Sequence, residues 1–114
     1  MYSNRAKFDT LRSVAAGSVT GSFVALGAPL ASPGVAFNCL NQTNGDVQLS
    51  FDGINPNLTL PANSYQVWDV RTNSPALNEY VLAGGTQFYV RQGTTAPSTG
   101  NFYIEVLKLD TAGS

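Results

Sequence analysis

The acidic residues are the first place to look for chemistry in this sequence, and they form no recognisable site. Seven acids are spread over 114 residues, and histidine is absent. Histidine is the commonest general base and a frequent metal ligand, so the sequence lacks the residue on which catalytic and metal sites most often depend. Asp46 and Asp52 lie on one expected strand, roughly 20 Å apart at ~3.3 Å per residue, which is too far for a glycosidase pair.

Two short motifs invite a functional interpretation and fail on spacing. The string Asp46–Gly53 (DVQLSFDG) lacks the closely spaced oxygen ligands that wrap a calcium ion, so turn chemistry explains it better. Gly84-Gly85-Thr86 has no lysine and no expected helix after it, unlike a phosphate-binding loop. The sequence therefore predicts no catalytic residue, no cofactor and no metal ion, and we expect a protein that is not an enzyme.

The aromatic residues could instead form a platform that stacks on sugars, as on carbohydrate-binding β-sandwiches. They include Trp68, Tyr65, Tyr80, Tyr89 and Tyr103. Trp68 and Tyr65 are three residues apart and fall on opposite faces of one strand, so they cannot share a flat platform. The interpretation favoured here is that these rings fill the core and a subunit interface, where Tyr and Trp are enriched.

Composition indicates one small domain that is poor in charge. Hydrophobic residues make up 43% of the chain and charged residues only 11%, with a net charge of −1. Few charges mean weak repulsion between copies, which favours self-association or a place in an assembly. The balance also lacks the basic patch that nucleic-acid binding usually needs. Cys39 stands alone, which excludes an intrachain disulfide, and we expect it in the core.

Alternating apolar residues near the C-terminus predict the strands around which the chain is organised. Thr86–Gln92 and Asn101–Leu109 are expected to form a hairpin through the loop Gly93–Gly100. The strand Asn101–Leu109 is apolar on both faces, which indicates a central or covered position. A second hairpin is expected at Asn44-Gly45, because both residues accept the positive φ of a type I′ turn.

Further short strands with turn signals between them predict the fold class. The expected strands around the Asn44-Gly45 turn and after it are Gly34–Asn41, Asp46–Asp52, Leu58–Leu60, Tyr65–Val70 and Tyr80–Leu82. The pattern is typical of a single-domain antiparallel β-sandwich, which we expect to be jelly-roll-like.

The N-terminal region divides into an arm and the start of the sandwich. Residues 1–12 are expected to form an extended arm and residues 13–114 the β-sandwich domain, with Phe8–Ser13 either a helical turn or a strand. Basic residues before the uncharged run Ser13–Ala31 have the outline of a secretory signal peptide. Glycines and hydroxyl residues dilute that run, so we favour two β-segments, Leu11–Ala16 and Ser22–Leu26, over a signal peptide or a membrane span.

Several runs resemble small tailed-bacteriophage virion proteins. They are Asn4–Phe8, Leu11–Ser13, Ser22–Leu30, Asp46–Gly53, Leu60–Ser64, Gly85–Gln92 and Tyr103–Val106. The resemblance implies a capsid decoration (cement) protein that stabilises neighbouring capsid subunits, or a head–tail connector or collar component. A carbohydrate- or receptor-binding module is the alternative from a different class.

This resemblance also implies partners and a location. The partners would be the major capsid protein or other virion proteins and further copies of the chain, with no nucleic acid and no membrane. The protein would be made in the host cytoplasm and reside in the virion. The implied interface residues are Arg5, Lys7, Phe8, Arg12, Tyr89 and Arg91. The arm is expected to contact another chain by adding a strand to a neighbour's sheet edge.

Overall fold

The computed structural model describes residues 2–69 and 83–111. Within them the chain forms antiparallel strands and one short 3-10 turn, Ala16–Ser18. The strands are β1 (Tyr2–Phe8), β2 (Arg12–Ala15), β3 (Val24–Ala25), β4 (Gly34–Asn41), β5 (Val47–Ser50), β6 (Leu58–Leu60), β7 (Ser64–Asp69), β8 (Tyr89–Gln92) and β9 (Asn101–Thr111). The expected strand Tyr80–Leu82 and the expected end of another at Val70 lie outside the described residues.

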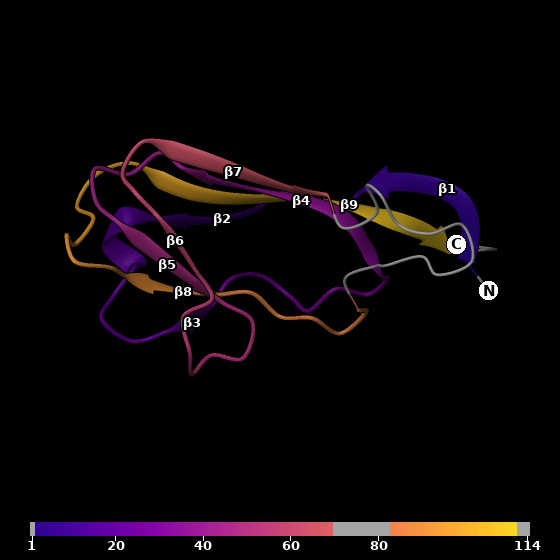
Figure 1. Ribbon diagram of the computed structural model, residues 1–114, viewed down its shortest axis with the longest axis horizontal. Coiled ribbons are helices and arrows are strands. Elements are labelled where there is room, and N and C mark those ends of the chain that lie inside the picture. The colour runs from indigo at the N-terminus through magenta and orange to yellow at the C-terminus, as the bar shows by residue number, and fades with distance from the viewer. Residues whose placement is uncertain (1, 70–82, 112–114) are drawn as a thin grey trace.

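The strands form two antiparallel sheets that pack as a β-sandwich, seen as an upper and a lower layer in Figure 1. Sheet A has the order β1-β9-β4-β7, with β2 also paired to β9, and sheet B has the order β3-β8-β5-β6. The pairs β2 with β9, β3 with β8, β4 with β7 and β5 with β6 are nested inside one another along the chain. Such nesting is a long antiparallel hairpin rolled into two layers, so the predicted jelly-roll-like sandwich is confirmed.

Strand β9 lies at the centre of sheet A, as its two apolar faces predicted. It pairs with β4 along one edge and with β1 and β2 along the other. Its inward residues Phe102, Ile104 and Val106 are at most 1% exposed. A strand paired on both edges and buried on one face has few backbone groups left for water, so β9 is firmly held in the sheet.

The hairpin predicted at Asn44-Gly45 is wrong. Strand β4 belongs to sheet A and β5 to sheet B, so the connection crosses between layers. Neither residue of the turn has a positive φ. Instead the buried Asn41 donates from Nδ2 to the carbonyl of Leu60 at 3.0 Å, and Thr43 donates from Oγ1 to Asn41 Oδ1 at 2.6 Å. Asn41 also satisfies the backbone of the buried crossing, because its Nδ2 donates to the Gly45 carbonyl and its Oδ1 accepts from Thr43 N, which a local turn signal does not reveal.

The C-terminal hairpin is wrong for the same reason. Strands β8 and β9 lie in different sheets, and the connection through residues 93–100 crosses from one layer to the other. The crossing is tight, because a Cβ on Gly45 would lie 2.5 Å from Pro97 N and 2.6 Å from Thr95 O. The two crossings therefore pack against each other and close one end of the sandwich.

Strand β1 extends the sheet along the distal part of β9. The register pairs Phe8 with Leu107 and Tyr2 with Thr111, with an irregularity between. In Figure 1 this ribbon reaches beyond the region where the two sheets overlap. The N-terminal segment is therefore extended, as expected, and pairs within its own chain.

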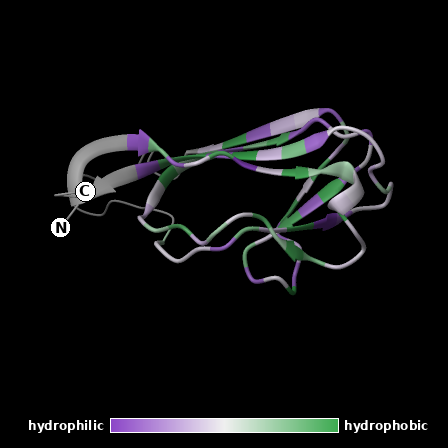
Figure 2. Ribbon diagram, turned by 180° about the vertical axis from the view of Figure 1, so that it is seen from behind, coloured by the Kyte–Doolittle hydropathy of each residue, from purple (hydrophilic) through white to green (hydrophobic). Residues whose placement is uncertain are grey.

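The core lies between the sheets and is aromatic at its centre. Phe37 packs against Phe51 and Phe88 with ring centroids 5.9 and 5.7 Å apart, and Cys39 is fully buried as predicted. Along the strands, apolar and polar residues alternate (Figure 2). The uncharged N-terminal run contributes the core residues Val19, Leu26 and Leu30, which agrees with β-segments there.

Candidate functional site

The outer face of sheet A, turned away from sheet B, carries several apolar side chains. Exposed side chains on it include Phe8 at 78%, Tyr65 at 70% and Val67 at 61% exposure. We define the outer apolar face as these three residues together with Leu11, Ala36, Leu40, Tyr103 and Leu107. Four strands and the β1–β2 junction contribute to it, so tertiary pairing assembles it from distant segments.

The strand register sets the rows of this face. Leu40 lies between Tyr65 on β7 and Tyr103 on β9, and Leu107 lies between Ala36 on β4 and Phe8 on β1. Cross-strand neighbours on one face lie within contact distance, so each row forms a continuous apolar strip.

A polar pair interrupts the middle row. Asn38 Nδ2 donates to Glu105 Oε1 at 2.8 Å, and Val67 lies on the other side of Asn38. A shallow groove of about 320 Å³ runs beside the pair, lined largely by the apolar residues around it. Among the described side chains of this face Glu105 carries the charge, so the face offers apolar contact with one oriented acceptor.

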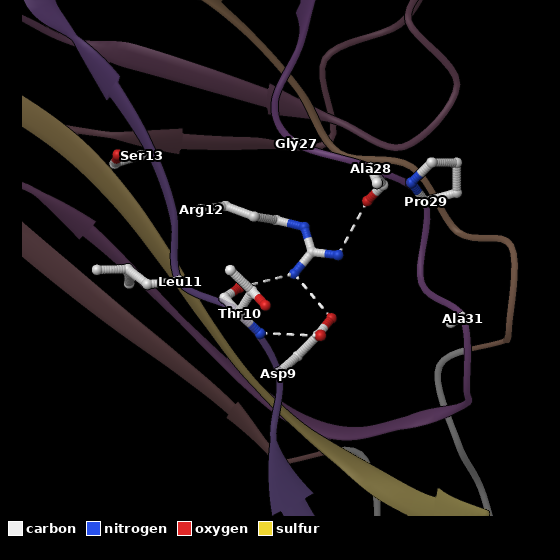
Figure 3. Close-up of a pocket in the computed structure, with 9 residues that line it drawn as sticks. All are labelled: Asp9, Thr10, Leu11, Arg12, Ser13, Gly27, Ala28, Pro29 and Ala31. Atoms are coloured by element: carbon white, nitrogen blue, oxygen red, sulfur yellow. Dashed lines mark hydrogen bonds and ion pairs between the residues drawn. The ribbon is translucent and has the colours of Figure 1, made fainter. Parts of the chain in front are cut away.

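A second candidate is a pocket of about 490 Å³ between the β1–β2 junction and the loop at Gly27–Ala31 (Figure 3). The Arg12 guanidinium points into the centre of this pocket in Figure 3. Its Nη1 donates to Asp9 Oδ2 at 3.0 Å and to the Thr10 carbonyl at 3.3 Å, and its Nη2 donates to the Ala28 carbonyl at 2.9 Å. The guanidinium also lies over the ring of Phe88, 5.6 Å from the centroid.

Asp9 is the electrostatic partner in this pocket. Burial by itself raises the pKa of Asp9, but hydrogen bonds from Thr10 N, Arg12 and Lys108 outweigh it and hold the pKa below its usual value. The Lys108 ammonium lies 3.3 Å from Asp9 Oδ1. One carboxylate thus joins the β1–β2 junction to β9.

The pocket is built to hold the fold together. Arg12 is 7% exposed, and its terminal nitrogens already bind within the chain. The third guanidinium nitrogen, Nε, is buried without a partner, in a place where a Cβ on Gly27 would lie 3.2 Å from it. Gly27 has φ +74°, which also favours glycine. The printed bonds of the guanidinium all lie within the chain and join Asp9, Thr10 and Ala28, so the pocket works as a clamp.

The structure distributes the predicted interface residues over both faces of the sandwich. Phe8 belongs to the outer apolar face, Lys7 is exposed on β1, and Arg5 lies on the same strand. Arg12 is buried in the clamp.

The other two predicted interface residues lie on the outer side of sheet B. Tyr89 is half-buried, and a Cβ on Gly53 would lie 3.2 Å from its ring. Arg91 lies over Phe23, 4.4 Å from the ring centroid, and donates from Nε to Gln48 Oε1 at 2.7 Å. The six residues do not come together, and their role as an interface stays a prediction.

Sequence reasoning missed most of the outer apolar face. The available signal was the apolar outer side of the strand that became β9, with Tyr103 and Leu107, and the pairing of Tyr65 with Val67 on one strand face. Trp68 turns the other way, where it stacks on Phe37 with centroids 6.4 Å apart. The two faces of β7 therefore separate Tyr65 from Trp68, as the alternation predicted.

The described part of the chain gives two negative findings on metal and membrane features. Residues 2–69 and 83–111 contain no group of three or more His, Cys, Asp or Glu side chains that could hold a metal ion. In the same part of the chain no helix has the length and apolarity to cross a membrane.

Comparison with known proteins gives a structural match at low identity. No family model and no curated protein matches the chain. A solved structure described as "Bacillus endospore appendages form a novel family of disulfide-linked pili" matches 93% of this chain and 89% of its own, at 12% identity and a TM-score of 0.49.

This finding corrects the phage interpretation. The resemblance to tailed-phage virion proteins is wrong, since the matching structure comes from a pilus-forming spore appendage. The roles as capsid cement, head–tail component or receptor-binding module, the capsid partner and the virion location are wrong with it. Strand and turn patterns of the kind used for that resemblance recur in unrelated sandwiches, because the same period-2 alternation and turn chemistry serve them all.

Proposed function

We propose that this chain is a non-enzymatic structural subunit that associates with copies of itself. The observation that carries the proposal is the outer apolar face, where Phe8, Tyr65 and Val67 each expose more than half of their surface. Large contiguous apolar patches on a protein surface mark sites of contact with other molecules. Burying such a face removes apolar area from water, which is the main driving force of association.

The low charge of the chain supports a second copy as the partner. Charged residues are 11% of the chain and the net charge is −1, so copies approach one another with little repulsion. Strand β7 adds a further contact surface, because among the described strands it pairs with β4 alone, on one edge. An unpaired edge exposes backbone donors and acceptors to a neighbouring strand. The predicted arm of residues 1–12 is part of the same proposal through Phe8.

Association of this chain would not use disulfides. The sequence has one cysteine, Cys39, which is fully buried in β4. Burial raises the pKa of the Cys39 thiol to about 12, so the nucleophilic thiolate is scarce near neutral pH. The disulfide linkage of the Bacillus appendage pili therefore has no counterpart in this sequence, and non-covalent contacts must suffice.

Sedimentation equilibrium of the full chain with reducing agent tests the proposal. We expect the weight-average mass to rise with protein concentration, and to do so equally with and without the reductant. A chain that stays monomeric throughout the concentration series would contradict the proposal. Association that disappears on reduction would also contradict it, because disulfides would then be responsible.

A further inference from the structure

We infer that the outer apolar face of sheet A packs face to face against the same face of a second copy, about a two-fold axis. This inference rests on the proposed function and adds to it the surface and the symmetry of the contact. In a two-fold contact each residue of the patch meets a residue of the same patch, so one surface suffices for both partners.

The shape of the face suits a copy of itself. Sheet A is a twisted antiparallel sheet, and two sheets with the same hand of twist pack with strands about 30° apart and layers about 10 Å apart. The rows Tyr65–Leu40–Tyr103 and Phe8–Leu107–Ala36 flank the polar middle row. Two such faces stacked by a two-fold axis bring apolar rows together, as the inner faces of one sandwich do.

The charge of the face also favours a copy over a charged partner. Glu105 is the charge among its described side chains, and Asn38 already donates to its Oε1 at 2.8 Å. A basic or acidic partner would bring further charges onto an apolar surface that has no groups to pair with them, and buried unpaired charges are costly. A second copy adds a single charge, its own Glu105, whose carboxylate accepts the same hydrogen bond from Asn38; the repulsion between the two carboxylates opposes the contact.

The size of the face predicts a weak contact. Four strands at about 4.8 Å spacing and about five residues at 3.3 Å give roughly 320 Å² per copy. The total of about 640 Å² for two copies is about half of the roughly 1,200 Å² that stable complexes start from. We therefore expect rapid exchange between monomer and dimer, and persistent assembly only when other contacts, such as the β7 edge, act together with this one.

A pair of matched lysine variants tests the surface. Val67→Lys puts a charge on the outer apolar face, on edge strand β7 at a site 61% exposed. Thr59→Lys makes the same kind of change at an exposed, β-branched residue of edge strand β6 in sheet B. We expect Val67→Lys to raise the dissociation constant of the dimer by at least about tenfold and Thr59→Lys to change it less than about twofold. Circular dichroism and unfolding midpoints establish that both variants fold.

A third variant, Glu105→Gln, tests the two-fold arrangement. Glu105 lies near the middle of the face, so the two-fold stacking brings the two carboxylates toward each other. Glutamine retains an acceptor for Asn38 and removes the repulsion, so association should tighten by about two- to five-fold.

The outcomes separate this inference from the proposed function. A wild-type chain that never associates overturns both. If the wild-type chain associates and Val67→Lys and Thr59→Lys behave alike, the outer apolar face is not the contact surface, although self-association still holds. Weaker association of Glu105→Gln overturns the two-fold arrangement. Selective loss in Val67→Lys together with a gain in Glu105→Gln supports the inference.

Discussion

The Asp9–Arg12 clamp allows a prediction whose size can be worked out from the structure. Replacing Arg12 by Met keeps the aliphatic stem and removes the guanidinium. The change removes the bond to Asp9 Oδ2, the bonds to the Thr10 and Ala28 carbonyls, and the contact over the Phe88 ring. Asp9 keeps its bonds to Thr10 N and Lys108, so its carboxylate still has hydrogen-bond donors in the variant.

The expected cost follows from these losses. A hydrogen bond to a charged group contributes about 1.5–3 kcal/mol, and a cation–π contact about 0.5–1 kcal/mol. Water can enter the adjoining pocket of about 490 Å³ and solvate the freed carbonyls, which limits the remaining loss. We therefore expect Arg12→Met to lower the free energy of unfolding by about 3 kcal/mol, which corresponds to about 10–15 °C in Tm.

The pH dependence provides an independent check. The native pKa of Asp9 lies below its unfolded value, so its contribution is present above about pH 4 and is lost as the pH falls through the lowered native pKa. In Arg12→Met the native pKa should move back up. The difference in unfolding free energy between wild type and variant should therefore narrow as the pH falls below about 4.

Urea unfolding at several pH values, followed by tryptophan fluorescence, measures these effects. Arg91→Met is the matched control, because Arg91 also lies over a phenylalanine ring but is on the half-buried outer side of sheet B. We expect it to cost less than about 1 kcal/mol. Equal, small effects of Arg12→Met and Arg91→Met would refute the stabilising role of the clamp. So would a difference in unfolding free energy between wild type and Arg12→Met that stays constant from neutral to acid pH.

Three further predictions concern local structure. Gly45→Ala should destabilise the fold by at least about 2 kcal/mol, since its Cβ would meet the backbone at Pro97 and Thr95, whereas Gly17→Ala, with nothing within 4 Å, should be nearly neutral in urea unfolding. The Asp52 carboxylate accepts hydrogen bonds from the backbone N–H groups of Asn55 and Ile54, which hold its pKa well below its usual range; an ordinary pKa in an NMR titration of its carboxyl carbon would disprove that turn. Cys39, fully buried, should resist a thiol reagent in the native protein and react fully in denaturant, and rapid native labelling would contradict its placement.

Local patterns predicted the strands better than their partners. The strands Gly34–Asn41 and Leu58–Leu60 have the predicted bounds, and the alternation in Asn101–Leu109 correctly assigned Phe102, Ile104 and Val106 to the core. Alternation succeeds because the side-chain period of a strand is a property of the local backbone. Both predicted hairpins failed, because a turn signal marks a change of direction and carries no information on whether the next strand joins the same sheet.

The sequence by itself determined that this is an all-β chain, poor in charge, with a buried thiol and apolar strand faces, since these follow from residue type and a period of two. Only the tertiary structure decided which apolar residues remain outside. Leu40, Tyr65, Val67 and Tyr103 form one surface because β4, β7 and β9 pair in sheet A, across gaps of up to dozens of residues. Likewise Arg12 is a cation, a residue type usually found exposed, but it is buried here because Asp9 and the Ala28 carbonyl converge on it. Pairing between distant segments depends on the packing of the whole sandwich, which no local window of sequence contains.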